Sequence, residues 1–111
     1  MSSDVVTLEV ANHIGLVTLN RPPVNAVNAE VRDRIIQIFD LANDRDDIRV
    51  LVLTGQGKIF SAGADLKQRP DPTIPGAYWH HNRITRETNN AIRECAKPVI
   101  AAVNGAALGA G

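Results

Sequence analysis

The sequence lacks several features that would mark a special class of protein. Its only cysteine is Cys95, so an intrachain disulfide framework is excluded and a reducing, cytoplasmic setting is favoured. The 12 basic and 12 acidic residues cancel, which leaves no basic field for nucleic acid or an anionic membrane. No apolar run is long enough to span a bilayer, and MSSDVVTLEV at the start lacks the pattern of a signal peptide. These absences favour a cytoplasmic protein that binds neither nucleic acid nor membrane.

The periodicity of apolar residues predicts an α/β fold within one unit, residues 1–111. Two runs rich in β-branched residues, 5–10 and 14–19, predict a hairpin. Helical spacing begins after Asn28, which suits an N-cap, and should end near Asn43 and Asp44. A second amphipathic helix follows the proline-containing loop 68–76 and must end at or before Lys97, because Pro98 comes next.

Three further apolar stretches predict strands. Residues 50–53 and 99–103 are typical of buried strands, the first of them buried on both faces, and residues 59–61 form a short additional one. The expected order is therefore β-β-α-β-β-α-β, a ββα unit that repeats.

Two of these strands run into turns of small residues, at 61–64 and at 104–111. Glycine and alanine shield the backbone little, so a ligand can approach the N–H groups closely. If both turns meet in space, two N–H groups would converge on one carbonyl oxygen. That arrangement is an oxyanion hole, which stabilises an enolate or a tetrahedral intermediate. The simpler interpretation is that the glycines make tight turns at strand ends.

Three segments, taken together and in this order, resemble the crotonase (enoyl-CoA hydratase/isomerase) superfamily. They are Arg21-Pro22 followed by Asn25-Ala26-Val27-Asn28, then IFSAGADLK at 59–67, and KPVIAAVNGAALGAG at 97–111. The resemblance covers nearly the whole chain and implies a crotonase-type spiral of ββα units. It implies an acyl-CoA or enoyl-CoA substrate, with coenzyme A entering as part of the thioester and no separate cofactor. It also implies a homotrimer or a dimer of trimers.

The resemblance assigns the two oxyanion N–H groups to Ala64 and Ala110. Many members carry glycine at the second position; alanine keeps the N–H but adds a methyl that could narrow the pocket. The reaction implied is syn addition of water to a trans-2-enoyl-CoA in fatty-acid-type degradation, with isomerisation or another enolate reaction as the alternative. The substrate-binding positions implied are Val24, Ala26, Ala62, Gly63, Ala64, Asp65, Leu66, Lys67, Ala106, Gly109 and Ala110.

Four charged residues have two interpretations each. Lys67 is a candidate for a phosphate of CoA, with Arg21 and Arg69 as weaker candidates, and the alternative for each is a solvated side chain. Asp65 could in principle be catalytic, but its place before Leu66-Lys67 suits an N-cap better.

Other candidates receive less support. Tyr78 and Trp79 could cover the acyl pocket, although aromatic residues at the start of a helix more often serve packing. His80-His81 lacks the spaced Cys, Asp or Glu partners of a metal site, so no metal is expected. A serine hydrolase is an alternative, because Ser61 precedes Ala62-Gly63 and the chain contains histidines and aspartates. However, Ile59 stands where the nucleophile elbow requires its first glycine.

The general acid and base of hydratases in this superfamily lie beyond the second oxyanion residue, and the chain ends at Gly111. Glu87 and Glu94 belong to the preceding helix and cannot replace them. Hydration needs a base to orient water and an acid to protonate the α-carbon. We therefore expect the N-terminal part of a longer enzyme, not competent as a hydratase alone. The alternative is a catalytically silent CoA-binding fragment.

Overall fold

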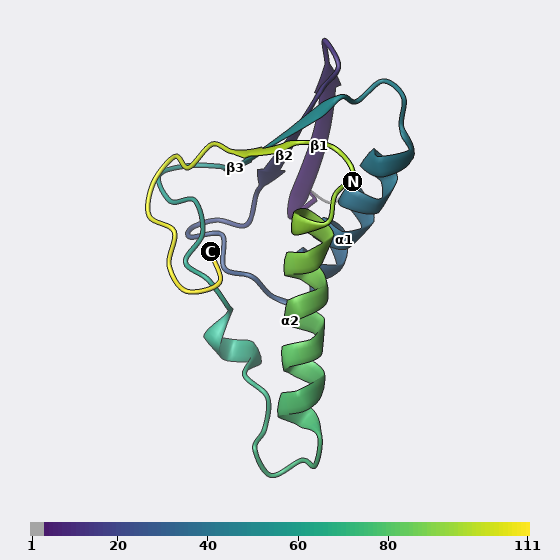
Figure 1. Ribbon diagram of the computed structural model, residues 1–111. Coiled ribbons are helices and arrows are strands. Elements are labelled where there is room, and N and C mark those ends of the chain that lie inside the picture. Colours follow the sequence, from purple (N-terminus) through teal and green to yellow (C-terminus); the bar gives the residue numbers. More distant parts are fainter. Residues whose placement is uncertain (1–3) are drawn as a thin grey trace.

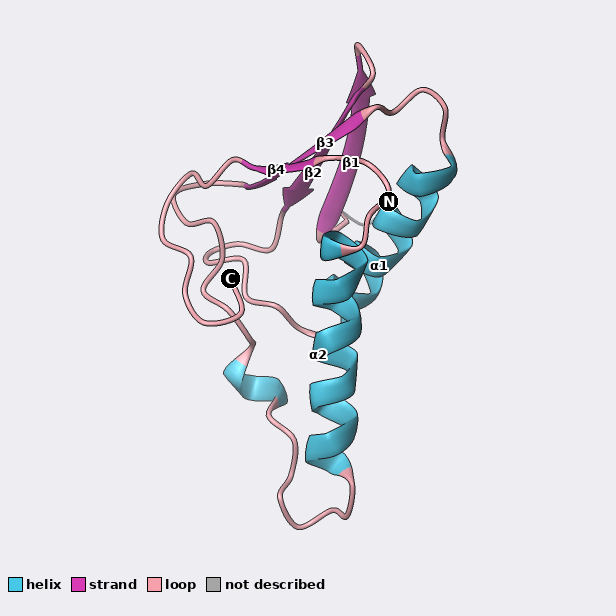
Figure 2. Cartoon of the chain, in the orientation of Figure 1, coloured by secondary structure: helices cyan, strands magenta, loops and turns pink. Residues whose placement is uncertain are grey.

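The computed structural model describes residues 4–111 (Figures 1 and 2), so residues 1–3 of the expected unit, including the start of MSSDVVTLEV, lie outside the described residues. The elements in chain order are β1 (Val6–Ala11), β2 (Ile14–Leu19), α1 (Ala29–Asp44), β3 (Val50–Gly55), the 3₁₀ helix η1 (Leu66–Gln68), α2 (Ala77–Arg93) and β4 (Val99–Ala101).

The four strands form one mixed sheet in the order β1-β2-β3-β4. β1 and β2 are antiparallel and form the predicted hairpin. Asn12 and His13 connect them with φ of 53° and 66°, the left-handed conformation that a two-residue turn requires. β3 is parallel to β2, and β4 is parallel to β3, so α1 and α2 lie on the two crossover connections.

Helix α1 confirms the prediction at both ends. Asn28 is the N-cap, and its Oδ1 accepts a hydrogen bond from the N–H of Val31 at 2.9 Å. One face of α1 is buried against the sheet, and α2 packs beside α1 (Figure 1). The buried apolar core consists of Val6, Val17, Leu19, Val31, Ile35, Ile38, Phe39, Ala42, Ile48, Leu51, Leu53 and Phe60.

The expected strand at 59–61 is not formed. Only Ser61 makes an isolated parallel bridge, with Ala107. A strand would use the backbone carbonyls of Ile59 and Phe60 to bond to a neighbouring strand. Both carbonyls instead accept hydrogen bonds from the side-chain amide of Asn25. The described order is therefore β-β-α-β-α-β, with η1 after β3.

Two expectations of burial also need correction. β3 alternates, with Leu51 and Leu53 buried and Val50 and Val52 only half-buried. β4 was expected to be buried, but Ile100 is 55% exposed. The exposure of β4 follows from its position, because the strand is short and lies at the edge of the sheet.

Candidate functional site

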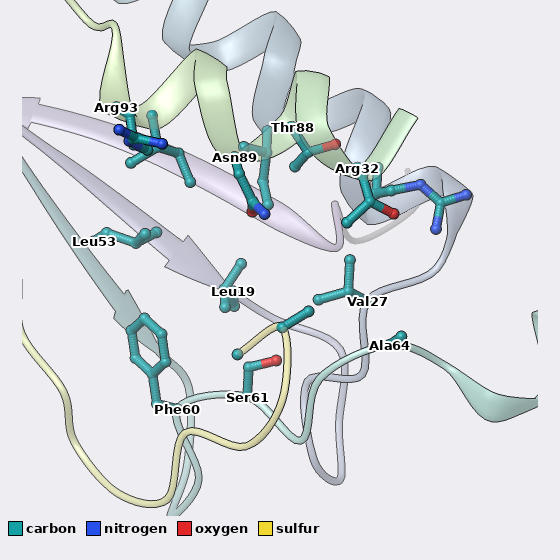
Figure 3. Close-up of a pocket in the computed structure, with 15 residues that line it drawn as sticks. Leu19, Val27, Arg32, Leu53, Phe60, Ser61, Ala64, Thr88, Asn89 and Arg93 are labelled. Carbon is teal, nitrogen blue, oxygen red and sulfur yellow. The ribbon is translucent and has the colours of Figure 1, made fainter. Parts of the chain in front are cut away.

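A pocket of about 370 Å³ lies between the sheet, the two helices and the C-terminal segment (Figure 3). Its lining residues are Leu19, Val27, Arg32, Ile35, Leu53, Phe60, Ser61, Ala64, Thr85, Thr88, Asn89, Ile92, Arg93, Ala110 and Gly111. Ala64 and Ala110, from the two small-residue turns, are both in this set. No lining side chain is a carboxylate, an imidazole or a thiol.

The N–H of Ala64 is left free by the geometry of its neighbours. Val27 makes a parallel bridge to Ala64. The N–H of Val27 donates to the carbonyl of Gly63 at 2.8 Å, and the carbonyl of Val27 accepts from the N–H of Asp65 at 2.9 Å. A trans peptide holds its C=O and the next N–H in opposite directions. The N–H of Ala64 therefore points away from Val27, and it donates to no acceptor within residues 4–111.

The N–H of Ala110 is free for a different reason. The N–H of Gly111 donates to the carbonyl of Leu108 at 2.8 Å and closes a four-residue turn. Gly109 takes the second position of that turn with φ of 55°. Ala110 is third, where a turn makes no internal use of the N–H. It has no acceptor in the described part of the chain.

The two turns are in direct contact. The N–H groups of Phe60 and Ser61 both donate to the carbonyl of Ala106, at 3.0 and 3.2 Å, and Leu108 donates to the carbonyl of Ser61 at 3.0 Å. At Gly63, whose φ is 90°, an added methyl would lie 2.5 Å from the Leu108 oxygen and 3.2 Å from the Ala110 nitrogen. Glycine is therefore required at position 63 for the turns to approach this closely.

Asn25 organises the surrounding backbone, a role that sequence reasoning missed. It is 2% exposed and has φ of 54°. Its Nδ2 donates to the carbonyls of Gln56, Ile59 and Phe60 at 2.9–3.1 Å, and its Oδ1 accepts from the N–H of Arg21. The sequence signal was the asparagine itself, since asparagine tolerates the left-handed conformation and bonds to nearby backbone.

Arg21 and Asp65 join the two loops that carry the expected binding residues. Their side chains form an ion pair at 2.9 Å, and Arg21 Nη1 also donates to the carbonyl of Ala26 at 3.0 Å. Asp65 Oδ1 accepts from the N–H of Lys67 at 2.9 Å and caps η1, which confirms the predicted N-cap. The Lys67 N–H, and then the Arg21 guanidinium, hold the pKa of Asp65 below its usual value. Arg21 is thus engaged within the protein.

The other predicted binding residues fall into two groups. Residues 24–27 run beside residues 62–65, with the N–H of Ala62 donating to the carbonyl of Val24 at 2.9 Å, and the turn containing Ala106 and Gly109 lies across from them. The second group is exposed to solvent: Leu66 is 74% exposed, and the side chains of Lys67 and Arg69 are also exposed.

Tyr78 and Trp79 lie at the start of α2, 44% and 78% exposed, and neither lines the pocket. α2 reaches the pocket instead through residues of its second half.

Ser61 is not placed to act as a nucleophile. It is 1% exposed, and its hydroxyl donates to the carbonyl of Asn25 at 2.8 Å while accepting from the N–H of Gly63 at 3.1 Å. Its proton is therefore directed at a carbonyl, and the pocket lining contains no histidine that could accept it. Within residues 4–111, no group of three His, Cys, Asp or Glu side chains could hold a metal ion.

None of the helices in the described range has the length and apolar character needed to cross a membrane.

Comparison with known proteins gives a consistent result. Residues 9–111 match the sequence profile of the family "Enoyl-CoA hydratase/isomerase". The chain is 39% identical over 106 residues to "Probable enoyl-CoA hydratase, mitochondrial" of Dictyostelium discoideum, covering 95% of this chain and 37% of that protein. It is 41% identical over 110 residues to "(E)-benzylidenesuccinyl-CoA hydratase" of Thauera aromatica, covering 96% and 41%.

Solved structures show the same likeness. Pseudomonas aeruginosa DspI superposes with a TM-score of 0.90 at 36% identity, covering 100% of this chain and 42% of that one. An enoyl-CoA hydratase from Bacillus anthracis gives a TM-score of 0.86 at 33% identity, covering 96% and 42%. The expected crotonase-type α/β fold is thereby confirmed over this chain, which spans about two-fifths of the length of these proteins.

Proposed function

The chain belongs to the enoyl-CoA hydratase/isomerase family, and on that premise we propose that it binds an acyl-CoA thioester and polarises its carbonyl through the N–H groups of Ala64 and Ala110. One observation carries this proposal: two backbone donors from contacting turns line one pocket and have no acceptor within residues 4–111. Two such donors satisfy the negative oxygen of an enolate better than the neutral carbonyl, because hydrogen bonds to a charged acceptor are stronger.

The reaction that this arrangement best serves is hydration of a trans-2-enoyl-CoA. Addition of water places negative charge on the thioester oxygen, where fixed donors lower the barrier. The hydratases among the relatives support this choice. Isomerisation or another enolate reaction is the alternative, because it would use the same two donors. We also propose a cytoplasmic enzyme that assembles as a trimer or a dimer of trimers.

Proton transfer is not supplied by the described pocket. Its lining contains no side-chain carboxylate or histidine to orient water; Glu87 on α2 and Glu94, the C-cap of α2, both lie outside it. We therefore expect residues 1–111 alone to bind the thioester without hydrating it. Mixing this chain with crotonyl-CoA and following the loss of enoyl absorbance tests that expectation, and turnover by a preparation whose intact mass matches 111 residues would contradict it.

The two-donor site itself is tested with acetoacetyl-CoA, whose enolate absorbs in the near ultraviolet. We expect it to bind at least about tenfold more tightly than CoA alone, with an increase in enolate absorbance. Gly63→Ala should abolish most of that preference, because its methyl would meet the Leu108 carbonyl and push the second turn away.

Gly57→Ala is the matched control. Gly57 has φ of 88°, nearly that of Gly63, but an added methyl there meets nothing within 4 Å. Both substitutions incur backbone strain of about 1–3 kcal/mol, so their thermal unfolding should shift in the same direction. Only Gly63→Ala should lose the preference for acetoacetyl-CoA. If both variants keep the preference, or if the unsubstituted protein has none, the two-donor site is wrong.

A further inference from the structure

We propose that the hydroxyl of Ser61 is a positioning group that sets the direction of the Ala64 N–H donor, while the main chain of the same residue holds the turn that presents Ala110. This inference rests on the proposed function and extends it to a side chain that lines the pocket but is almost fully buried. Ser61 is 1% exposed and lies beside the C-terminal segment at the edge of the pocket (Figure 3). Because the hydroxyl already donates to Asn25 and accepts from Gly63, it acts on a bound thioester through the backbone that it holds.

The hydroxyl fixes the first turn. Its oxygen accepts from the N–H of Gly63 at 3.1 Å, and the carbonyl of Gly63 in turn accepts from Val27 at 2.8 Å. With both polar groups of Gly63 occupied, the peptide between Gly63 and Ala64 has a single orientation. That orientation directs the N–H of Ala64 away from Val27.

The main chain of Ser61 fixes the second turn. Its N–H donates to the carbonyl of Ala106, and its carbonyl accepts from the N–H of Leu108, the first residue of the turn that presents Ala110. The space is tight here, because a methyl on Gly111 would lie 2.8 Å from Ser61 Cβ. A glycine is therefore needed at position 111 for the contact.

Ser61 is itself held rigidly by Asn25. The hydroxyl donates to the Asn25 carbonyl at 2.8 Å, and Asn25 is immobilised by three carbonyls that accept from its side-chain amide. Removing the hydroxyl would leave the buried N–H of Gly63 and the carbonyl of Asn25 without this partner. The N–H of Gly63 would then turn toward another acceptor and move the peptide that carries the Ala64 N–H. The N–H groups of Ala64 and Ala110 would no longer point at the same oxygen atom. Electrostatic stabilisation of an enolate depends steeply on such geometry.

The experiment compares Ser61→Ala and Ser61→Cys in the protein, using the ratio of acetoacetyl-CoA affinity to CoA affinity together with the enolate absorbance. We expect Ser61→Ala to lower this ratio by roughly tenfold to a hundredfold. That effect should not exceed the effect of removing one oxyanion donor completely. The affinity for CoA alone should change much less than this ratio, because CoA alone has no thioester carbonyl for the two N–H donors to bind. Ser61→Cys replaces the hydroxyl with a somewhat larger thiol that makes weaker hydrogen bonds, and it should recover part of the ratio.

Ile38→Val serves as the control for destabilisation. Ile38 is 1% exposed on α1 and lies outside the pocket lining, so this variant should lower the melting temperature and leave the ratio unchanged. If Ser61→Ala behaves like Ile38→Val, Ser61 is merely structural and the inference is overturned. If the unsubstituted protein shows no preference for acetoacetyl-CoA, the proposed function fails and the inference fails with it.

Discussion

Individual polar side chains hold the backbone of the site, and their own hydrogen-bonding groups are occupied by partners within the protein. The side-chain amide of Asn25 donates to three backbone carbonyls, and the hydroxyl of Ser61 both donates and accepts a hydrogen bond. The carboxylate of Asp65 pairs with Arg21 and accepts from the N–H of Lys67. Among the groups left free to meet a ligand are the backbone N–H groups of Ala64 and Ala110. Substitutions of these polar residues should therefore act on binding through geometry.

Asp65 makes this geometry dependent on pH. Its folded pKa is lowered by the Lys67 N–H and then by Arg21, so its contribution to stability is present above the unfolded pKa of about 3.9. The contribution is lost as the pH falls through the lower, folded pKa. We expect Asp65→Asn, which can still cap η1 but cannot pair with Arg21, to melt at a lower temperature than the unsubstituted protein near pH 7. The difference should shrink as the solution becomes strongly acidic.

Melting curves of both proteins from neutral to strongly acidic pH test this prediction. Asp40→Asn, at an exposed position of α1, is the control and should show a smaller difference at neutral pH. A melting-temperature difference for Asp65→Asn that stays constant across the whole pH range would contradict the assignment.

At the scale of elements, the C-terminus of α1 depends on the segment that follows α2. The last turn of α1 contains no basic residue. Lys97 supplies the missing charge, because its Nζ donates to the carbonyls of Ala42, at 2.6 Å, and Arg45. Asn43 Oδ1 also accepts from the N–H of Ala96 at 2.9 Å. The end of α1 is thus fixed to Ala96 and Lys97, in the short segment between α2 and β4.

Lys97→Met should uncouple these two elements. The substitution keeps most of the apolar stem but removes a cation that bonds to helix carbonyls, so we expect a loss of about 1–2 kcal/mol in the free energy of unfolding. Denaturant titration measures this loss, and hydrogen exchange should become faster at the end of α1. Lys58→Met, at an exposed position, is the control. Equal stability of the two variants would show that the contacts of Lys97 contribute nothing.

At the scale of the whole molecule, apolar surface remains exposed at one edge of the sheet. β4 has three residues and lies at that edge, and Ile100, Val103 and Leu108 are 55%, 57% and 58% exposed. The overall extents, 49 × 29 × 28 Å, show an elongated shape, because α2 and the loop before it extend beyond the sheet (Figure 1). An exposed apolar edge strand offers both unpaired backbone groups and apolar side chains to a second molecule.

We expect this chain of 111 residues to associate as its concentration rises, and Ile100→Lys to weaken that association. Because Ile100 is largely exposed, the substitution should leave the melting temperature nearly unchanged. Leu41→Lys, which alters a 49% exposed leucine on α1, is the matched control and should associate like the unsubstituted chain. Sedimentation velocity over a range of concentrations gives the comparison. Identical association of the two lysine variants would rule out the β4 edge as the contact.

Features that depend on neighbours a few residues away could be predicted from the sequence. The hairpin of β1 and β2, the Asn28 cap, the end of α1 and the Asp65 cap all follow from local spacing and capping chemistry. The family was also readable, because its three segments are continuous in the chain. The strand expected at 59–61 failed because a distant side chain, that of Asn25, takes its carbonyls.

The sequence by itself therefore determined the local elements, the two small-residue turns and the family to which they belong. Only the tertiary structure decided that the turns touch, that Ala64 and Ala110 keep free N–H groups beside one pocket, and that Ser61 and Asn25 hold them there. The physical reason is that a free or occupied hydrogen-bonding group depends on partners from other parts of the chain. Those partners meet only when the sheet and its crossovers have formed.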